Sequence, residues 1–159
     1  MSIKHPIISV TGSSGAGTSS VKKTFERIFR REKVTAAYIE GDAFHRYDRL
    51  EMKQVMAEEE ERGNNHFSHF GPEANRLEDL EAVFRQFGES GSGRTRHYIH
   101  DDEEAELYGA PAGTFTDWEE IPQDTELLFY EGLHGAVVTD DVNVAQHCDL
   151  KIGVVPVVN

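Results

Sequence analysis

The sequence predicts an α/β fold in which a mostly parallel sheet carries helices on both faces. Two segments, residues 6–11 and 34–39, are short and almost continuously apolar, which is typical of parallel strands covered on both sides. The segment between them, residues 19–32, repeats its apolar side chains at helical spacing, at Val21, Phe25, Ile28 and Phe29. This alternation predicts a βαβ unit at the start of the chain.

Two further helices are expected in the middle of the chain. The first covers residues 49–62, and its acidic run, residues 58–61, is interpreted as a solvated face rather than a metal site. The second follows Gly71-Pro72 and has four apolar side chains facing inward: Leu77, Leu80, Phe84 and Phe87. Gly and Ser dominate residues 88–93, which are therefore predicted to form a flexible loop.

Three more strands are expected towards the C-terminus. Residues 94–100 alternate like a strand and are predicted to pair with residues 115–118. Core strands are expected at residues 127–130 and 150–157. The whole chain, residues 1–159, is long enough for one domain. Because the last strand is followed by no closing helix, we expect this domain to be incomplete at its C-terminus.

The charge of the chain is unevenly distributed. Residues 1–96 carry as many basic as acidic side chains, so residues 97–159, with Lys151 as their one basic residue, carry the whole net charge of −13. So acidic a chain is not expected to bind nucleic acid by neutralising phosphates. The imbalance suggests that basic groups come from a partner or from further chain.

Cysteine content and hydropathy indicate the compartment. Cys148 is the single cysteine, which excludes an internal disulfide and a cysteine-based zinc site. The sequence has no apolar run long enough to span a membrane, and its N-terminus lacks the layout of a signal peptide. We therefore expect a soluble, cytoplasmic protein without a membrane partner.

A glycine-rich motif between the first strand and the first helix predicts a phosphate-binding loop. The run Gly12-Ser13-Ser14-Gly15-Ala16-Gly17-Thr18-Ser19 has the spacing G-x-x-x-x-G-[K/T]-[S/T], and Ser20 continues it into the helix. Glycines allow backbone N–H groups to surround phosphate oxygens, and the helix N-terminus adds partial positive charge. Ser19 stands where a hydroxyl would ligate Mg²⁺. The alternative is a strand–helix turn without a ligand.

The loop departs from the usual pattern at one position. Thr18 replaces the lysine that normally contacts the β- and γ-phosphates. Since a charge-assisted hydrogen bond contributes roughly 1.5–3 kcal/mol, another cation should compensate. Arg49 is one candidate, and a basic residue outside these 159 positions is the other.

Asp42 follows the second predicted strand and is the candidate general base. Ligands of open α/β sheets bind at the carboxyl ends of strands, so Asp42 and the phosphate loop should face one crevice. A carboxylate there can accept the proton of a hydroxyl that attacks the γ-phosphate. A helix cap and a water-mediated contact to Mg²⁺ are the alternatives. His45 and Arg49 favour the catalytic interpretation, because they could meet a phosphate on the acceptor.

A second carboxylate and several histidines complete the set of candidates. Glu131 ends an apolar strand, as does the acid that organises Mg²⁺ in nucleotide-hydrolysing sheets, although many strands end in Glu. Three further residues could line an acceptor pocket or be structural: Tyr98, His100 and His134. His66 and His69 have a metal-ligand spacing but no evident third ligand, and a surface loop is the preferred interpretation.

Five runs of this sequence resemble the bacterial type of the phosphoribulokinase family, within the uridine-kinase-like branch of phosphate-loop kinases. They are ISVTGSSGAGTSSVKKTF, IEGDAFHRYDR, FSHFGPEAN, GRTRHYIHDDEEA and LLFYEGLHGAVV. The resemblance implies a nucleoside triphosphate hydrolase-like fold and a kinase that uses ATP and Mg²⁺ to convert D-ribulose 5-phosphate to ribulose 1,5-bisphosphate in the Calvin cycle. Threonine at position 18 is normal for this type.

The resemblance also implies roles for individual residues. Asp42 resembles the base that deprotonates the substrate C1 hydroxyl, and Glu131 resembles the metal-organising carboxylate. The sugar-phosphate site corresponds to His45, Arg49, Tyr98, His100 and His134. Arg31 falls in a Phe-Arg-Arg-Glu run that is linked in bacterial members to allosteric activation by NADH.

The resemblance extends only to the first half of the family's proteins. The remaining half would hold a lid with basic residues and the contacts of a homo-oligomer, which would account for the charge of −13. No cysteine lies near the phosphate loop, so the thiol regulation of the plant type is not expected. A uridine or pantothenate kinase of the same fold is the near alternative. A non-catalytic nucleotide-binding module is the alternative if 159 residues are the natural length.

Overall fold

A four-stranded parallel sheet forms the centre of the computed structural model, which describes residues 4–156. The strand order is β2-β5-β1-β6, with β1 at Ile7–Gly12, β2 at Ala36–Glu40, β5 at Leu127–Gly132 and β6 at Leu150–Val154. Register pairs Ile7 with Leu128 across β1 and β5, and Glu40 with Glu131 across β2 and β5. The carboxyl ends of the strands therefore lie at one edge of the sheet.

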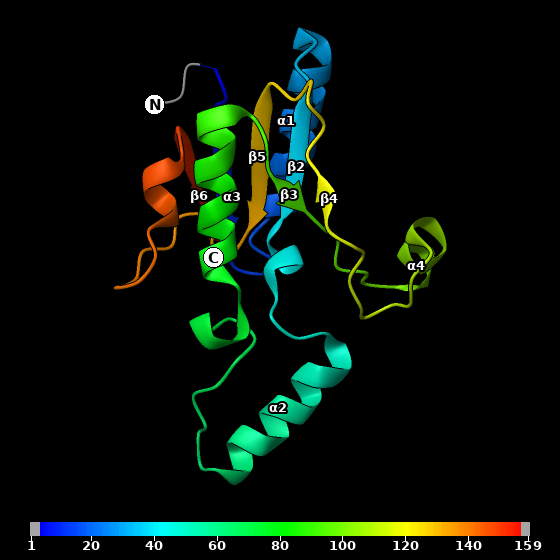
Figure 1. The fold of residues 1–159 in the computed structure, drawn as a ribbon, viewed down its shortest axis with the longest axis vertical. Coiled ribbons are helices and arrows are strands. Elements are labelled where there is room, and N and C mark those ends of the chain that lie inside the picture. The colour runs from blue at the N-terminus through cyan, green and yellow to red at the C-terminus, as the bar shows by residue number, and fades with distance from the viewer. Residues whose placement is uncertain (1–3, 157–159) are drawn as a thin grey trace.

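Two helices cover opposite faces of this sheet. Helix α1 (Thr18–Glu32) lies behind the sheet and helix α3 (Leu77–Ser90) in front of it in Figure 1. Side chains alternate along β5, so that Leu127 and Phe129 pack in the core on the α1 side, whereas Leu128 and Tyr130 pack in the core with α3. The predicted strands are thus confirmed, but β2 lies at the edge of the sheet, and Ile39 is its one buried residue.

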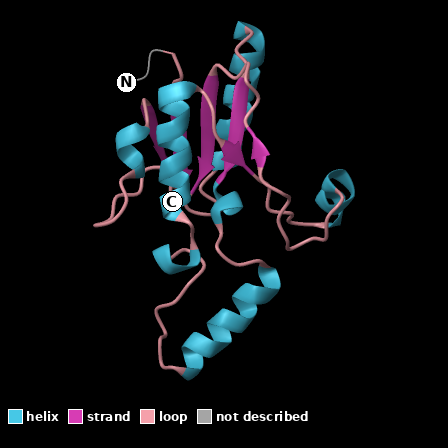
Figure 2. Cartoon of the chain, in the orientation of Figure 1, coloured by secondary structure: helices cyan, strands magenta, loops and turns pink. Residues whose placement is uncertain are grey.

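The remaining elements lie around this sheet. They comprise the 3₁₀ helices η1 (Gly41–Phe44), η2 (Pro72–Ala74) and η3 (Val144–His147), helices α2 (Arg49–Glu61) and α4 (Asp102–Tyr108), and the two-stranded ladder of β3 (Arg94–Thr95) with β4 (Glu119–Glu120). Of these, η3 packs on α3 and lies directly before the amino end of β6. Helix α2 projects away from the sheet, and α4 lies at the end of a long excursion from the ladder (Figure 2). Among residues 4–156, no helix combines the length and apolar character needed to cross a bilayer.

Three predicted elements differ from the structure. Residues 88–90 of the predicted flexible loop are helical, because buried Phe87 anchors the last turn of α3, and the helix ends at Gly91, which has a φ of 71°. Residues 94–100 form a ladder only at their first two residues, with a single bridge from Tyr98 to Phe115 further on. The last strand ends at Val154, and residue 157 lies outside the described residues.

Candidate active site

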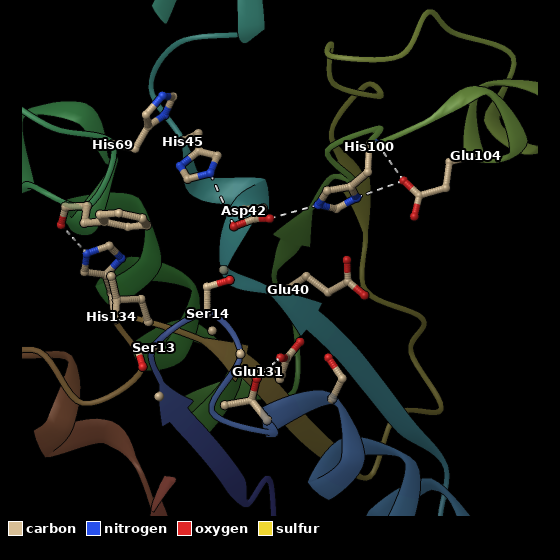
Figure 3. Close-up of a pocket in the computed structure, with 18 residues that line it drawn as sticks. Ser13, Ser14, Glu40, Asp42, His45, His69, His100, Glu104, Glu131 and His134 are labelled. Carbon is tan, nitrogen blue, oxygen red and sulfur yellow. Dashed lines mark hydrogen bonds and ion pairs between the residues drawn. The ribbon is translucent and has the colours of Figure 1, made fainter. Parts of the chain in front are cut away.

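A cavity of about 970 Å³ opens at the carboxyl edge of the sheet. Its walls come from the turn after β1, the ends of β2 and β5, the loop at His69 and Phe70, and the segment from His100 to Glu104 (Figure 3). The crevice that the sequence predicts between the phosphate loop and Asp42 is therefore present. Among the residues that the structure describes, none that lines this cavity is a lysine or an arginine.

The phosphate-loop motif forms the turn between β1 and α1. Six of its residues line the cavity: Gly12, Ser13, Ser14, Gly15, Thr18 and Ser19. Ala16, Gly17 and Ser20 do not line it, and Gly17 instead starts α1 with a φ of 100°, a conformation that side chains disfavour. The loop thus presents its backbone, two serines and the N-terminus of a 15-residue helix to the cavity.

Thr18 contacts the second predicted carboxylate. Its hydroxyl Oγ1 donates to Oε1 of Glu131 at 2.5 Å, which ties the start of α1 to the end of β5. The threonine at the usual lysine position therefore orients Glu131, which lines the cavity together with Ser19. Lys22, one helical turn after Thr18, pairs at 2.7 Å with Glu40, which also lines the cavity.

Asp42 lies in η1, directly after β2, between two histidines (Figure 3). Its Oδ1 is 3.3 Å from Nε2 of His45, and its Oδ2 is 2.9 Å from Nε2 of His100. The carboxylate therefore bonds to imidazoles and does not cap a helix. The hydrogen bond to His45 lowers the pKa of Asp42, and the bond to His100 lowers it further. Burial opposes this change, and the resulting pKa is about 2.

A buried asparagine fixes the protonation of His45. Asn75 is 1% exposed, and its Nδ2 group donates to the carbonyls of His69 and Gly71. Its Oδ1 must then be an acceptor, so Nδ1 of His45, 2.9 Å away, carries a hydrogen. Burial by itself lowers the pKa of His45, but the hydrogen bonds to Asp42 and Asn75 outweigh it and raise that pKa. Its contacts to Asn75 and Asp42 favour the imidazolium form of His45.

Two predicted substrate residues do not line the cavity. Nη2 of Arg49 donates to the carbonyl of His100 at 2.7 Å, so the guanidinium supports the cavity wall from outside. Tyr98 packs edge-to-face against His45 and His100, with ring centroids 5.8 and 5.1 Å away. Arg31 is a further predicted residue away from the cavity, exposed near the end of α1 and paired with Glu32.

The cavity contains functional candidates that the sequence analysis passed over. His69, interpreted as a surface-loop residue, lines the cavity with its ring centroid 6.4 Å from that of His45. His134 lines it as predicted, and its Nε2–H donates to the carbonyl of Phe70 at 2.9 Å. Among the described residues no group of three acidic, histidine or cysteine side chains could hold a metal, so His66 and His69 form no such site.

Arg96 anchors the turn that carries Asp42. Its Nε and Nη2 groups donate to the carbonyls of Ala43 and His45, each at 2.8 Å. The guanidinium lies 3.6 Å from the ring centroid of Phe115 and 4.8 Å from that of Trp118. Stacking and forked hydrogen bonds are an arginine-specific combination, so lysine could not replace this anchor.

The lowered pKa of Asp42 predicts a specific acid sensitivity. A carboxylate whose pKa is lower in the folded than in the unfolded protein stabilises the fold. This stabilisation is complete at pH values above the pKa of the unfolded state, and it is lost as the pH falls through the pKa of the folded state. The stability difference between the native protein and Asp42→Asn should therefore narrow between about pH 4 and pH 2, which urea unfolding at several pH values would measure. The change in the stability difference should be modest, because the Asp42 carboxylate is half-exposed and solvent screens its ion pairs. A difference that stays constant over this range would contradict the ion pairs described above.

The fold and this edge define a nucleotide-binding domain of the phosphate-loop class. A strand, a glycine-rich turn and a helix form its loop, and two acids from neighbouring strand ends face the same cavity. Residues 7–159 match the model of the phosphoribulokinase / uridine kinase family. The chain belongs to this family, as the sequence resemblance implies.

Relatives of known name support this assignment. The chain is 70% identical over 156 residues to a phosphoribulokinase of Nitrobacter vulgaris, covering 98% of this chain and 54% of that protein. It is 63% identical to the chromosomal phosphoribulokinase of Cupriavidus necator, covering all of this chain and again 54% of the relative. The chain thus spans about half the length of the curated relatives it matches.

Solved structures agree with the fold. The phosphoribulokinase of Rhodobacter spheroides superimposes with a TM-score of 0.87 at 57% identity, covering 97% of this chain and 52% of that one. A protein described as a possible uridine kinase of Bacillus stearothermophilus gives a TM-score of 0.63 at 13% identity, over 96% of this chain and 72% of that one. This second likeness concerns the fold alone. The predicted phosphate-loop α/β fold is confirmed.

Proposed function

We propose that the protein carrying this chain is an ATP-dependent phosphoribulokinase, which phosphorylates the C1 hydroxyl of D-ribulose 5-phosphate to give ribulose 1,5-bisphosphate for the Calvin cycle. The observation that carries the proposal is a carboxylate, Asp42, between two imidazoles in the cavity that also holds the phosphate loop. The names of relatives at 63–70% identity support the choice of acceptor.

Asp42 acts as the general base in this proposal. The C1 hydroxyl oxygen forms a bond to the γ-phosphorus of ATP, the bond from that phosphorus to the bridging oxygen of ADP breaks, and the hydroxyl proton passes to Asp42. A carboxylate with a pKa of about 2 is ionised at every physiological pH and is therefore ready to accept. It is a weak base, but transfer through a loose transition state depends mainly on positioning and electrostatics.

ATP would lie on the phosphate loop, with its phosphates at the backbone of residues 12–15 and the N-terminus of α1. The donor set fits Mg²⁺, which keeps several waters and takes one or two protein ligands together with phosphate oxygens. Ser19 and Glu131, which both line the cavity, would hold it. The ion would neutralise charge on the transferred phosphoryl group.

The acceptor would occupy the histidine-lined part of the cavity. His45 and His100 face Asp42 from two sides, and His134 lines the cavity near Phe70. The ring nitrogens of His45 and His100 already have protein partners, so these residues would favour a phosphorylated acceptor through their positive charge. In this proposal Arg49 and Tyr98 contribute by supporting His100 and His45 from behind.

Regulation and assembly are proposed from the resemblance alone. Arg31, with its exposed guanidinium, would take part in activation by NADH, and the full-length protein would be a homo-oligomer. Titrating NADH into the native protein and Arg31→Ala, with activity as the readout, tests the first point. Equal activation of both proteins would remove Arg31 from this role.

A comparison of acceptors tests the main proposal. We expect a higher kcat/KM for ribulose 5-phosphate than for uridine with MgATP, because uridine lacks the phosphate that the histidines would bind. A higher value for uridine would exclude the phosphoribulokinase assignment. Binding of ATP without turnover of either acceptor would favour a non-catalytic nucleotide-binding module.

A further inference from the structure

His100 has a carboxylate at each of its ring nitrogens. Nε2 lies 2.9 Å from Oδ2 of Asp42, and Nδ1 lies 2.9 Å from Oε2 of Glu104. An ionised carboxylate can only accept hydrogen bonds, so a ring nitrogen that bonds to it must carry a hydrogen. With both nitrogens placed in this way, the geometry fits only the doubly protonated imidazolium (Figure 3).

The start of α4 holds Glu104 in position. Asp101 caps the helix by accepting the backbone N–H of Glu104 at 3.0 Å, and Oε2 of Glu104 accepts the backbone N–H of His100 at 2.7 Å. This arrangement is a variant of the capping box, in which the acid at the third helical position bonds back to the residues before the helix. The carboxylate that meets the imidazole is therefore fixed by secondary structure.

The other groups around His100 do not compete for its ring nitrogens. Arg49 bonds to the His100 carbonyl, Tyr98 contacts the ring edge-to-face, and His45 is a second cation on the far side of Asp42. Burial lowers the pKa of His100, and the bonds to Asp42 and Glu104 outweigh it, so that the pKa is raised. Asp42 and Glu104 therefore both stabilise the charge of His100. Asp42 is the proposed base, which leaves Glu104 as the carboxylate whose role is to support His100.

We infer that Glu104 is a positioning residue, which keeps His100 doubly protonated and directs its Nε2–H to Asp42. The consequence for catalysis rests on the proposed function. If His100 loses a proton while a residue at position 104 still accepts from Nδ1–H, then Nε2 presents a lone pair to Asp42. The base then loses one of the two contacts that orient it. The cavity also loses a cation, and no lysine or arginine among its described residues lines it.

Glu104→Gln tests the inference, with Glu103→Gln as its matched control. Glutamine keeps the size and an acceptor oxygen, so α4 should keep its cap. Glu103 is an exposed neighbour on the same helix, and its replacement changes the net charge equally. The pKa of His100, followed by NMR of ¹⁵N-labelled histidine and assigned with His100→Gln, should fall by about one unit in Glu104→Gln only. An equal pKa in both variants overturns the inference.

The native protein provides a readout that needs no variant. Near neutral pH, both ring nitrogens of His100 should give the ¹⁵N shifts of protonated imidazole nitrogens. A neutral tautomer, with one unprotonated nitrogen, overturns the inference even if Glu104→Gln does not fold.

Kinetics distinguish positioning from a merely structural role. In Glu104→Gln the alkaline limb of the pH profile of kcat/KM for ribulose 5-phosphate should move down by about one pH unit. At pH values above this limb kcat/KM should be roughly tenfold lower than in the native protein, and at low pH it should be near the native value. A loss that is uniform across pH overturns the positioning role. If the His100 pKa falls as expected but the native protein does not phosphorylate ribulose 5-phosphate, the coupling of Glu104 to His100 is supported and only the proposed function is overturned.

Discussion

Replacement of Asp42 by asparagine is expected to lower kcat for ribulose 5-phosphate by about 10²–10⁴-fold, with a much smaller change in KM. Asparagine has the same shape but cannot accept the hydroxyl proton as a carboxylate does. It also leaves His45 and His100, which both bond to Asp42, without their shared counter-ion. Steady-state kinetics with saturating MgATP would measure the effect.

Asp140→Asn is the matched control for this substitution. Asp140 is exposed and does not line the cavity, so the same loss of one negative charge there should leave kcat unchanged. If Asp42→Asn retained native kcat, Asp42 would not be the base. If instead KM rose while kcat stayed constant, the carboxylate would serve substrate binding alone.

Replacement of Glu131 by glutamine should lower kcat by about 100-fold and raise the Mg²⁺ concentration needed for half-maximal rate. The carboxylate lies near the end of β5 and lines the cavity, and the Thr18 hydroxyl fixes its orientation. Glutamine keeps the bond from Thr18 through its carbonyl oxygen but lacks the charge that attracts the ion. Titration of Mg²⁺ at fixed ATP separates the two effects.

Glu60→Gln, on the exposed part of α2, controls for the change in net charge. It should leave both kcat and the Mg²⁺ requirement unaltered. An unchanged Mg²⁺ requirement in Glu131→Gln would contradict the proposal that the carboxylate helps to hold the ion. The variant Thr18→Val, which removes the bond from Thr18 but keeps the acid, measures separately how much of the activity depends on the orientation of Glu131.

The central fold was predictable because local patterns and tertiary packing agree there. The apolar runs around Ile7 and Leu128 are buried strands, and that around Ile39 is an edge strand. The predicted face of α1 packs on the sheet through Val21, Phe25 and Phe29, whereas Ile28, predicted on the same face, is exposed because it turns away from the sheet. Helix α4 was not predicted because it has no buried face and relies on its cap. The capping-box spacing from Asp101 to Glu104 was the signal that could have found it.

The site was predictable only where a residue carries its own chemical signature. The phosphate loop, Asp42 and Glu131 follow strands, so their common edge could be derived from the topology of parallel sheets. Asn75 and Arg96 both bond to His45 through contacts between segments far apart in the chain. Such contacts depend on the course of loops, which hydrophobic periodicity does not determine. For the same reason Arg49, a plausible phosphate ligand in sequence, is found on a backbone carbonyl outside the cavity.

The anchor formed by Arg96 also determines which wall of the cavity can yield. Its two hydrogen bonds join the turn of Asp42 to the segment that follows β3, so these parts are expected to move as one rigid unit. A substrate that entered through this wall would have to displace the base itself. The Phe70 side chain also lines the cavity and is 64% exposed, while its backbone carbonyl accepts a hydrogen bond from His134. In the proposed reaction the acceptor is therefore expected to enter and leave past the Phe70 side chain, so that the geometry around Asp42 is preserved.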